Sequence, residues 1–582
     1  MEKTTRLTFP ERQPQGTQRM ETRPRAVRAW LAGLPVADSA ETGRTVYQAL
    51  SQSNRRPIRP GRRLAYLREL HRTIDHCVEG LRTRYRQREL PLRGEPRKTA
   101  TLVTRLLQEM ALGYEIALED LREKGIRPAR TTPALIAALH YRSRVLVENW
   151  VIYETPPPGT WKRLHQLYQI AVDKGLTSRR VRADWSDHER RASPASTYKR
   201  ICLAAATSPL QLDRGEILDV WMLLAHWASS AEISALSNDG DEVFRIPRRD
   251  DRPPHAGIGG LNREDDRYLI TTPLIRRVRR ELRRHRSRLP SLRRSSAAAD
   301  YPELTQRLLI ALAAVPSRQH RRIRVQSRIQ SVLGLSRAHE ALSEERGLAV
   351  PGNDTRERAF QSRDRNQSAK ERDVWDMIQP SAIDPEVERR LRGTNRDTTQ
   401  TTQSGKQSSS VEQWKLVNIS PRGYCLLANP EETYRARVGE ILLLREVANQ
   451  RRSWQVGVVR WLRGLGGKNL QVGVQILGKD PHPVMVRHRL QNGRYGPQER
   501  GFVLPGANGN DGIATLIAPG PHYQAGQQVS LRYGQAHSQI TLGYRREASN
   551  HFAQTEFEFA DPMAVDRGLS ELLSENPVNT AS

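Results

Sequence analysis

The spacing of apolar residues changes along this chain, and that change most constrains the fold. Between residues 27 and 342, apolar residues recur three or four positions apart, for example in residues 64–81 and 102–121. This spacing is typical of amphipathic helices that bury one face. After residue 410, short apolar runs alternate with glycine, asparagine and arginine, which is the pattern of antiparallel strands. The sequence therefore predicts a multidomain α + β protein with an all-α N-terminal module followed by β-domains.

Two groups of strands are expected after residue 410. In the first, a polar corner interrupts the apolar residues 414–427, and strands are expected at residues 438–445, 454–462 and 469–477. These strands indicate a small antiparallel sheet or barrel. In the second group, strands are expected at residues 500–504, 513–517, 528–533, 539–544 and 555–559, separated by glycine-rich turns. They predict a second, smaller β-domain.

The polar corner has the sequence Asn418-x-Ser420-x-x-Gly423. Asparagine and serine side chains can bond neighbouring backbone groups and fix a turn, while glycine permits a close approach to the backbone. Such a corner can hold a planar, polar ligand. A turn between strands without a ligand is the alternative interpretation.

A cluster of arginines lies upstream of the corner, directly before the apolar residues 329–335. With these two features the chain resembles the PilZ family, whose members have an Arg-x-x-x-Arg motif before the first strand and an Asp/Asn-x-Ser-x-x-Gly motif in a later turn. Arg318 and Arg322 match the first motif at the position that the family pattern implies, and Arg324 and Arg328 fit the same spacing. The resemblance implies a PilZ-like antiparallel β-barrel.

The resemblance also implies binding of cyclic di-GMP. This ligand has two phosphodiesters and two guanines, which planar, permanently charged guanidinium groups can bond in pairs of hydrogen bonds or stack upon. The implied ligand-binding residues are Arg318, Arg321, Arg322, Asn418, Ser420 and Gly423, with Arg324 and Arg328 as additional candidates. By the family's pattern, the arginines clamp the ligand while the corner seats a guanine and its phosphate.

The patterns together predict a domain layout. Residues 343–412 are polar with few core-forming residues, so they are expected to form a disordered insert, and a long insert costs little additional closure entropy. The layout is a basic tail at 1–26, the α-helical module at 27–316, the PilZ-like barrel at 317–342 and 413–490, the insert at 343–412, the C-terminal β-domain at 491–562 and a tail at 563–582.

The formal net charge of +30 keeps nucleic acid open as a partner, because such a charge attracts polyanions. The strongest candidate for such contacts is the arginine-rich helix expected at residues 275–288. A solvated helix face is the alternative interpretation.

Several classes of protein are not favoured. No run of apolar residues is long enough for a membrane span, and the first thirty residues lack the apolar region of a signal peptide, so a cytoplasmic protein is expected. Cys77, Cys202 and Cys425 are scattered without metal-binding spacing. We found no catalytic pair or phosphate-binding loop, and we expect neither an enzyme nor a cofactor.

The predicted function is that of a cyclic di-GMP receptor that couples ligand binding to a change in conformation or in partner binding. By resemblance, the controlled process is motility or surface attachment, and a protein partner is expected to bind the helical module. A ligand-free scaffold for protein partners and a basic nucleic-acid-binding protein are the alternatives.

Overall fold

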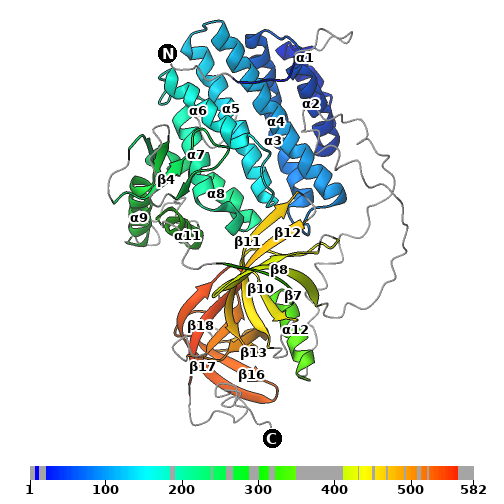
Figure 1. Ribbon diagram of the computed structural model, residues 1–582, viewed down its shortest axis with the longest axis vertical. Coiled ribbons are helices and arrows are strands. Elements are labelled where there is room, and N and C mark those ends of the chain that lie inside the picture. The colour runs from blue at the N-terminus through cyan, green and yellow to red at the C-terminus, as the bar shows by residue number, and fades with distance from the viewer. Residues whose placement is uncertain are drawn as a thin grey trace, which may run out of the picture. The chain divides into compact units, whose positions relative to one another are not determined.

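The structure is a computed structural model. It describes residues 7–11, 21–183, 191–236, 240–256, 266–287, 301–313, 322–348, 411–429, 431–447, 453–466, 469–489, 493–506, 513–520 and 523–560. The chain divides into two compact units, and Figure 1 labels their helices and strands. The first contains residues up to Leu333 together with Gln413–Leu477, and the second contains Gly334–Glu412 and the residues from Gly478 onward.

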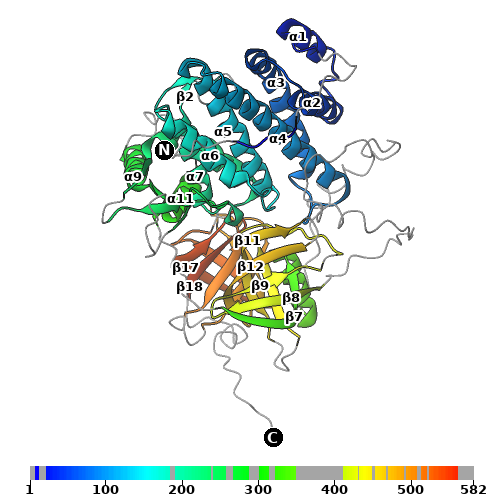
Figure 2. The same cartoon turned by 45° about the horizontal axis from the view of Figure 1, so that its top comes forward.

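The first unit begins with a bundle of helices. Its members are α1 (Pro24–Ala32), α2 (Ser39–Asn54), α3 (Pro60–Tyr85), α4 (Gly94–Glu123), α5 (Pro128–Val151), α6 (Thr160–Asp173), α7 (Pro194–Ala206) and α8 (Arg214–Trp227). The long helices α3, α4 and α5 follow one another through short turns and lie side by side (Figure 2). Leu70 and Ile74 of α3 and Leu106 and Met110 of α4 are completely buried. The predicted apolar faces of these two helices are therefore confirmed.

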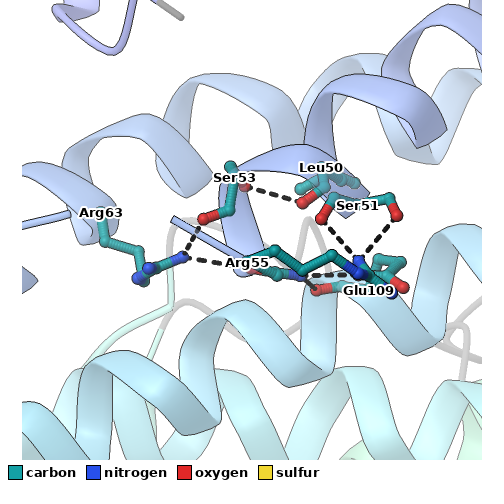
Figure 3. Close-up of polar contacts among 7 residues, drawn as sticks. Leu50, Ser51, Ser53, Arg55, Arg63 and Glu109 are labelled. Atoms are coloured by element: carbon teal, nitrogen blue, oxygen red, sulfur yellow. Dashed lines mark hydrogen bonds and ion pairs between the residues drawn. The ribbon is translucent and has the colours of Figure 1, made fainter. Parts of the chain in front are cut away.

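Buried polar contacts join three of these helices (Figure 3). Arg63 of α3 is fully buried, and its Nη1 donates to the carbonyl oxygen of Ser53 at 3.0 Å and to Asn54 Oδ1 at 3.2 Å. The last carbonyls of a helix have no hydrogen-bond donors within the helix. A cation at this end donates to them and is also stabilised by the negative end of the helix dipole. Next to it, Asn54 Nδ2 and Arg55 Nη1 contact Glu109 of α4.

A small sheet lies within the N-terminal module. The strands β3 (Glu232–Ser234), β4 (Val243–Ile246), β5 (His255–Ala256) and β6 (Arg267–Ile270) form an antiparallel sheet in the order β3-β6-β4-β5. The polar composition of residues 236–268 indicates a solvated loop, but β4, β5 and the first residues of β6 form here. Phe244, Ile246 and Leu269 are buried, because a short strand needs only alternate apolar residues to cover a core. The strands β1 (Val181–Arg182) and β2 (Arg191–Ala192) form a separate two-stranded sheet.

Short helical elements complete this module. They are the 3₁₀ turns η1 (Pro209–Gln211) and η2 (Ala228–Ser230) and the helices α9 (Thr272–Ser287) and α11 (Pro302–Ala313). Helix α9 confirms the arginine-rich helix predicted at 275–288. Within the described ranges, no helix is both long enough and apolar enough to cross a membrane.

The first unit also contains a closed six-stranded antiparallel barrel. Its strands are β7 (Ile323–Leu333), β8 (Glu412–Ser420), β9 (Gly423–Leu427), β10 (Ile441–Glu446), β11 (Gln455–Leu465) and β12 (Asn469–Lys479), in the order β10-β11-β12-β9-β8-β7. Val332, Leu416, Leu426, Leu444 and Val472 are buried. The strands predicted in the first group are confirmed.

The second unit contains one helix and a second closed barrel. The helix is α12 (Leu335–Glu345), and the strands are β13 (His482–His488), β14 (Glu499–Leu504), β15 (Thr515–Pro519), β16 (Gln528–Tyr533), β17 (Ala536–Ala548) and β18 (Phe552–Phe559). Their order is β13-β14-β15-β18-β17-β16. When the strands of each barrel are numbered one to six along the chain, both barrels close in the order 1-2-3-6-5-4. The second barrel therefore repeats the topology of the first.

Two predicted boundaries of the first barrel were wrong. Strand β13 was placed in the first barrel, but it pairs with β14 and β16 of the second. Residues 335–342 were also placed in the first barrel, but they form most of α12. Gly334 has a φ of 89° and ends β7, after which Ala338 and Leu342 are buried where α12 packs against β13 and β14. Apolar spacing alone did not distinguish a barrel strand from this short amphipathic helix.

Candidate ligand site on the first barrel

The corner between β8 and β9 brings three predicted site residues together. Ser420 pairs with Gly423 across the turn, and Asn418 pairs with Cys425. The Ser420 hydroxyl donates to the carbonyl oxygen of Gly423 at 3.1 Å. A register shift separates the pairs of Leu416 and Asn418, and such a bulge changes the direction of the side chains that follow it. Asn418, Ser420 and Gly423 thus lie at one end of the hairpin, as predicted.

Gly423 has a structural role that the sequence did not reveal. It pairs with Gln475 of β12, and a Cβ atom at Gly423 would lie 2.1 Å from the carbonyl oxygen of Val474. No side chain fits at this distance. The glycine therefore allows β9 and β12 to approach each other, whether or not a ligand is bound.

Arg322 directly precedes β7, the strand next to β8 in the barrel. Burial raises the pKa of the Cys425 thiol, while the positive charge of Arg322 and a hydrogen bond with the Asn418 side chain act in the opposite direction. The charge of Arg322 therefore reaches the corner, although the two are distant in the sequence. Arg322 is exposed, so its guanidinium is accessible to a ligand. The pairing of the arginine motif with the corner is consistent with this geometry.

The other arginines of the cluster have different positions. Arg318 and Arg321 lie outside the described residues. Arg324 and Arg328 are exposed on β7. Both are an even number of positions from Gln330, so all three side chains lie on the same side of the strand. Gln330 accepts a hydrogen bond from Arg445 Nε at 3.0 Å. This side of β7 is consequently rich in positive charge.

Further groups lie beside the corner, and we did not predict them as site residues. A Cβ atom at Gly473 would lie 1.9 Å from Trp461 Nε1, so the half-buried indole covers this glycine. Arg460 Nε donates to Gln475 Oε1 at 2.9 Å. Gly473 and Gln475 both pair with β9. The sequence around these residues indicates only strands and not a site, because β12 comes to lie next to β9 only when the barrel closes.

The chemical groups of this site suit binding. It offers a guanidinium, an amide, a hydroxyl and an indole, which can contact phosphate oxygens and the faces or edges of planar bases. Over the described ranges, no group of three or more His, Cys, Asp or Glu side chains is placed to hold a metal ion. These are the kinds of group that a nucleotide-binding surface uses.

A helical module followed by a barrel with these two motifs defines a PilZ-type protein. Comparison with family models agrees with this class. Residues 25–238 match the cyclic-di-GMP receptor FimW, N-terminal domain, residues 243–483 match its middle PilZ domain, and residues 484–560 match the FimW C-terminal beta-barrel domain. The chain belongs to the PilZ-domain family, and the predicted resemblance is confirmed.

One curated relative is similar along nearly the whole chain. It is the cyclic-di-GMP receptor FimW of Pseudomonas aeruginosa, which is 25% identical over 567 residues. The alignment covers 93% of this chain and 91% of the relative, so the similarity extends along nearly the full length of both. No solved structure matches this chain.

Proposed function

We propose that this chain is a cyclic di-GMP receptor whose ligand binds on the outer face of the first barrel. The observation that supports this most directly is that Arg322 directly precedes β7, the barrel neighbour of β8, whose Asn418 and Ser420 form the corner with Gly423. The match of residues 243–483 to the middle PilZ domain of a family named for this receptor supports the same ligand.

Each group has a specific proposed role. Arg318, Arg321 and Arg322 bind phosphate oxygens or guanine edges, because a guanidinium presents two parallel donors to such acceptors. Asn418 and Ser420 bond a guanine and its phosphate, and Gly423 keeps the turn close to β12. Arg324 and Arg328 add positive charge along β7.

The receptor acts by binding and without catalysis, in our proposal. A ligand that prefers one conformation shifts the population toward it, and this shift changes the surface that the helical module presents to a protein partner. We further propose that the protein is cytoplasmic and that it controls motility or surface attachment.

The test is isothermal titration of the full chain with cyclic di-GMP. We expect micromolar or tighter binding, and at least a tenfold loss of affinity in both Arg322→Ala and Ser420→Ala. The matched control is Arg487→Ala, which removes an exposed arginine of the second barrel and is expected to bind normally. A folded wild-type protein that does not bind in this assay or in an independent equilibrium assay would refute the receptor function and favour the ligand-free scaffold.

A nucleic-acid-binding function has one observation in its favour. Helix α9 buries Leu274 and Val278, and its opposite side exposes Arg276, Arg279, Arg280 and Arg283. In the parts of the chain that the structure describes, no carboxylate is paired with these four arginines. Titration with a short DNA duplex at two salt concentrations tests this candidate, since phosphate contacts give a steep salt dependence.

A further inference from the structure

A clamp joins the helical module to the first barrel within the first unit. We define the clamp by Glu89, Leu90 and Arg93, which lie between α3 and α4, and by Trp414 and residues 431–435 of the barrel. The Leu90 amide donates to the Tyr434 carbonyl at 2.8 Å, and the Tyr434 amide donates to the Leu90 carbonyl at 2.6 Å. The clamp thus contains a reciprocal pair of backbone hydrogen bonds.

Arg93 strengthens the clamp from the helical side. Its Nη1 donates to the carbonyl oxygen of Glu431 at 2.9 Å, and its Nη2 donates to that of Glu432 at 3.1 Å. One guanidinium therefore holds two successive backbone carbonyls. A planar fork with two parallel donors fixes orientation as well as distance.

Glu89 binds two further residues of the same segment. It accepts hydrogen bonds from Thr433 Oγ1 at 2.6 Å and from Arg435 Nε at 3.0 Å. Partial burial raises the pKa of Glu89, but these hydrogen bonds outweigh burial and hold it below its usual range. The carboxylate is charged at neutral pH and its bonds are charge-assisted.

An aromatic pair forms the buried part of the clamp. The rings of Trp414 and Tyr434 have centroids 4.4 Å apart, and each residue is only 2% exposed. Trp414 belongs to β8, so the same contact fixes the segment 431–435 and one strand of the hairpin that ends in the ligand corner. Aromatic pairs of this kind have a defined geometry.

The clamp and the ligand corner occupy opposite ends of the β8–β9 hairpin. Strand β8 runs from the clamp at Trp414 to the corner at Ser420, which at 3.3 Å per residue is roughly 20 Å. Strand β9 begins at Gly423 and ends at Leu427, shortly before residues 431–435. Both strands therefore connect the two sites directly.

We propose that the clamp positions the ligand hairpin and transmits ligand binding to the helical module. This inference rests on the proposed receptor function. A ligand that orders the corner also makes the β8–β9 hairpin more rigid, so less conformational entropy is lost when the clamp closes at the other end of the hairpin. Ligand binding and clamp formation are then positively cooperative. Because coupling between two binding events is reciprocal, ligand strengthens the clamp and the intact clamp strengthens ligand binding.

The test measures both directions of this coupling in the full chain. Amide hydrogen exchange is followed with and without saturating cyclic di-GMP, and we expect slower exchange at Leu90 and Tyr434 with ligand. In titrations, Arg93→Ala and Glu89→Gln are expected to weaken ligand binding about fivefold or more, the lower end of typical allosteric couplings. Arg88→Ala is the matched control, since this exposed arginine lies beside the clamp and its Nε donates to the Arg84 carbonyl oxygen at 3.5 Å, outside the clamp.

The possible results separate this inference from the receptor function. Unchanged or faster exchange at Leu90 and Tyr434, in a protein shown by titration to be saturated, would overturn the clamp's role and leave the receptor function intact. Equal ligand affinities in the wild type, Arg93→Ala and Glu89→Gln would also overturn the clamp's role and leave the receptor function intact. An absence of binding in the wild type would instead overturn the receptor function. In Ser420→Ala, the ligand is expected to leave exchange at the clamp unchanged.

Discussion

Replacing Gly423 with alanine is expected to weaken the pairing of β9 with β12 and, with it, cyclic di-GMP binding. The new Cβ atom would lie 2.1 Å from the Val474 carbonyl oxygen, 3.2 Å from the Val474 carbonyl carbon and 3.3 Å from the Gln475 Cα atom. All three atoms belong to the backbone of the neighbouring strand. A side chain could rotate away from the methyl group, but this strand can move only by breaking its pairing with β9.

The magnitude follows from the pairs that must open. Relief of the contact weakens the pairs Gly423–Gln475 and Tyr424–Val474. If two hydrogen bonds are lost at 0.5 to 1.5 kcal/mol each, the local cost is about 1 to 3 kcal/mol. Since about 1.4 kcal/mol corresponds to a factor of ten, the amides of β9 and β12 should exchange roughly 5- to 150-fold faster. Hydrogen exchange followed by mass spectrometry measures this change locally in a protein with several domains.

The control is Gly543→Ala in the second barrel. Its Cβ atom would lie 3.5 Å from the nearest atom, an ordinary van der Waals distance, so little change is expected. The reasoning would be refuted if Gly423→Ala and Gly543→Ala gave the same exchange rates in β9 and β12 and the same ligand affinity.

Three further predictions concern the fold and its surfaces. Arg63→Met should lower the free energy of unfolding of the helical module by about 3 kcal/mol or more, because buried acceptors at the end of α2 lose their donor, whereas the exposed Arg62→Met should change it little in urea denaturation. Burial lowers the pKa values of His339 and His482 to about 4, with the charges of Arg500 and Arg346 respectively acting in the same direction. Between pH 4 and about 6.5 the unfolded chain therefore binds more protons than the folded chain. The free energy of unfolding of the second unit should be highest above this range and fall as pH falls through it. Hydrogen exchange measured at several pH values tests this. If α9 binds nucleic acid, Arg280→Ala with Arg283→Ala should reduce affinity and salt slope together, and unchanged values would exclude this surface.

The sequence predicted the classes of the domains well because the apolar period differs between helices and strands. The buried stripe of α4, from Leu102 to Leu121, has the spacing that only a helix face requires. The apolar spacing did not predict β4 to β6, because these strands have too few apolar positions to show a period. Nor did it predict that residues 335–342 form α12, because a single amphipathic turn or two resembles a buried strand in composition.

The candidate site was only partly accessible to sequence reasoning. The Asn418-x-Ser420-x-x-Gly423 corner is local in the chain, so its geometry follows from a two-residue turn between paired strands. Trp461 and Gln475 are brought beside the corner by barrel closure, which depends on pairing between distant strands. The clamp at Leu90 and Tyr434 likewise depends on a tertiary contact between segments that have no common motif.

The repeated topology raises the question of whether the second barrel also binds ligand. In the first barrel, strands two and three meet at the tight Ser420–Gly423 turn, whereas the corresponding sequence, residues 505–514, lacks an Asn-x-Ser-x-x-Gly motif. The first two strands of the second barrel contact α12 through Arg500 and Glu340, 2.8 Å apart, and through His339 and the Val484 carbonyl oxygen, 3.2 Å apart. These strands are already occupied by a helix of the same chain. We therefore expect Ser420→Ala to leave no cyclic di-GMP binding of wild-type affinity in titration, and residual binding with that affinity would instead reveal a site on the second barrel.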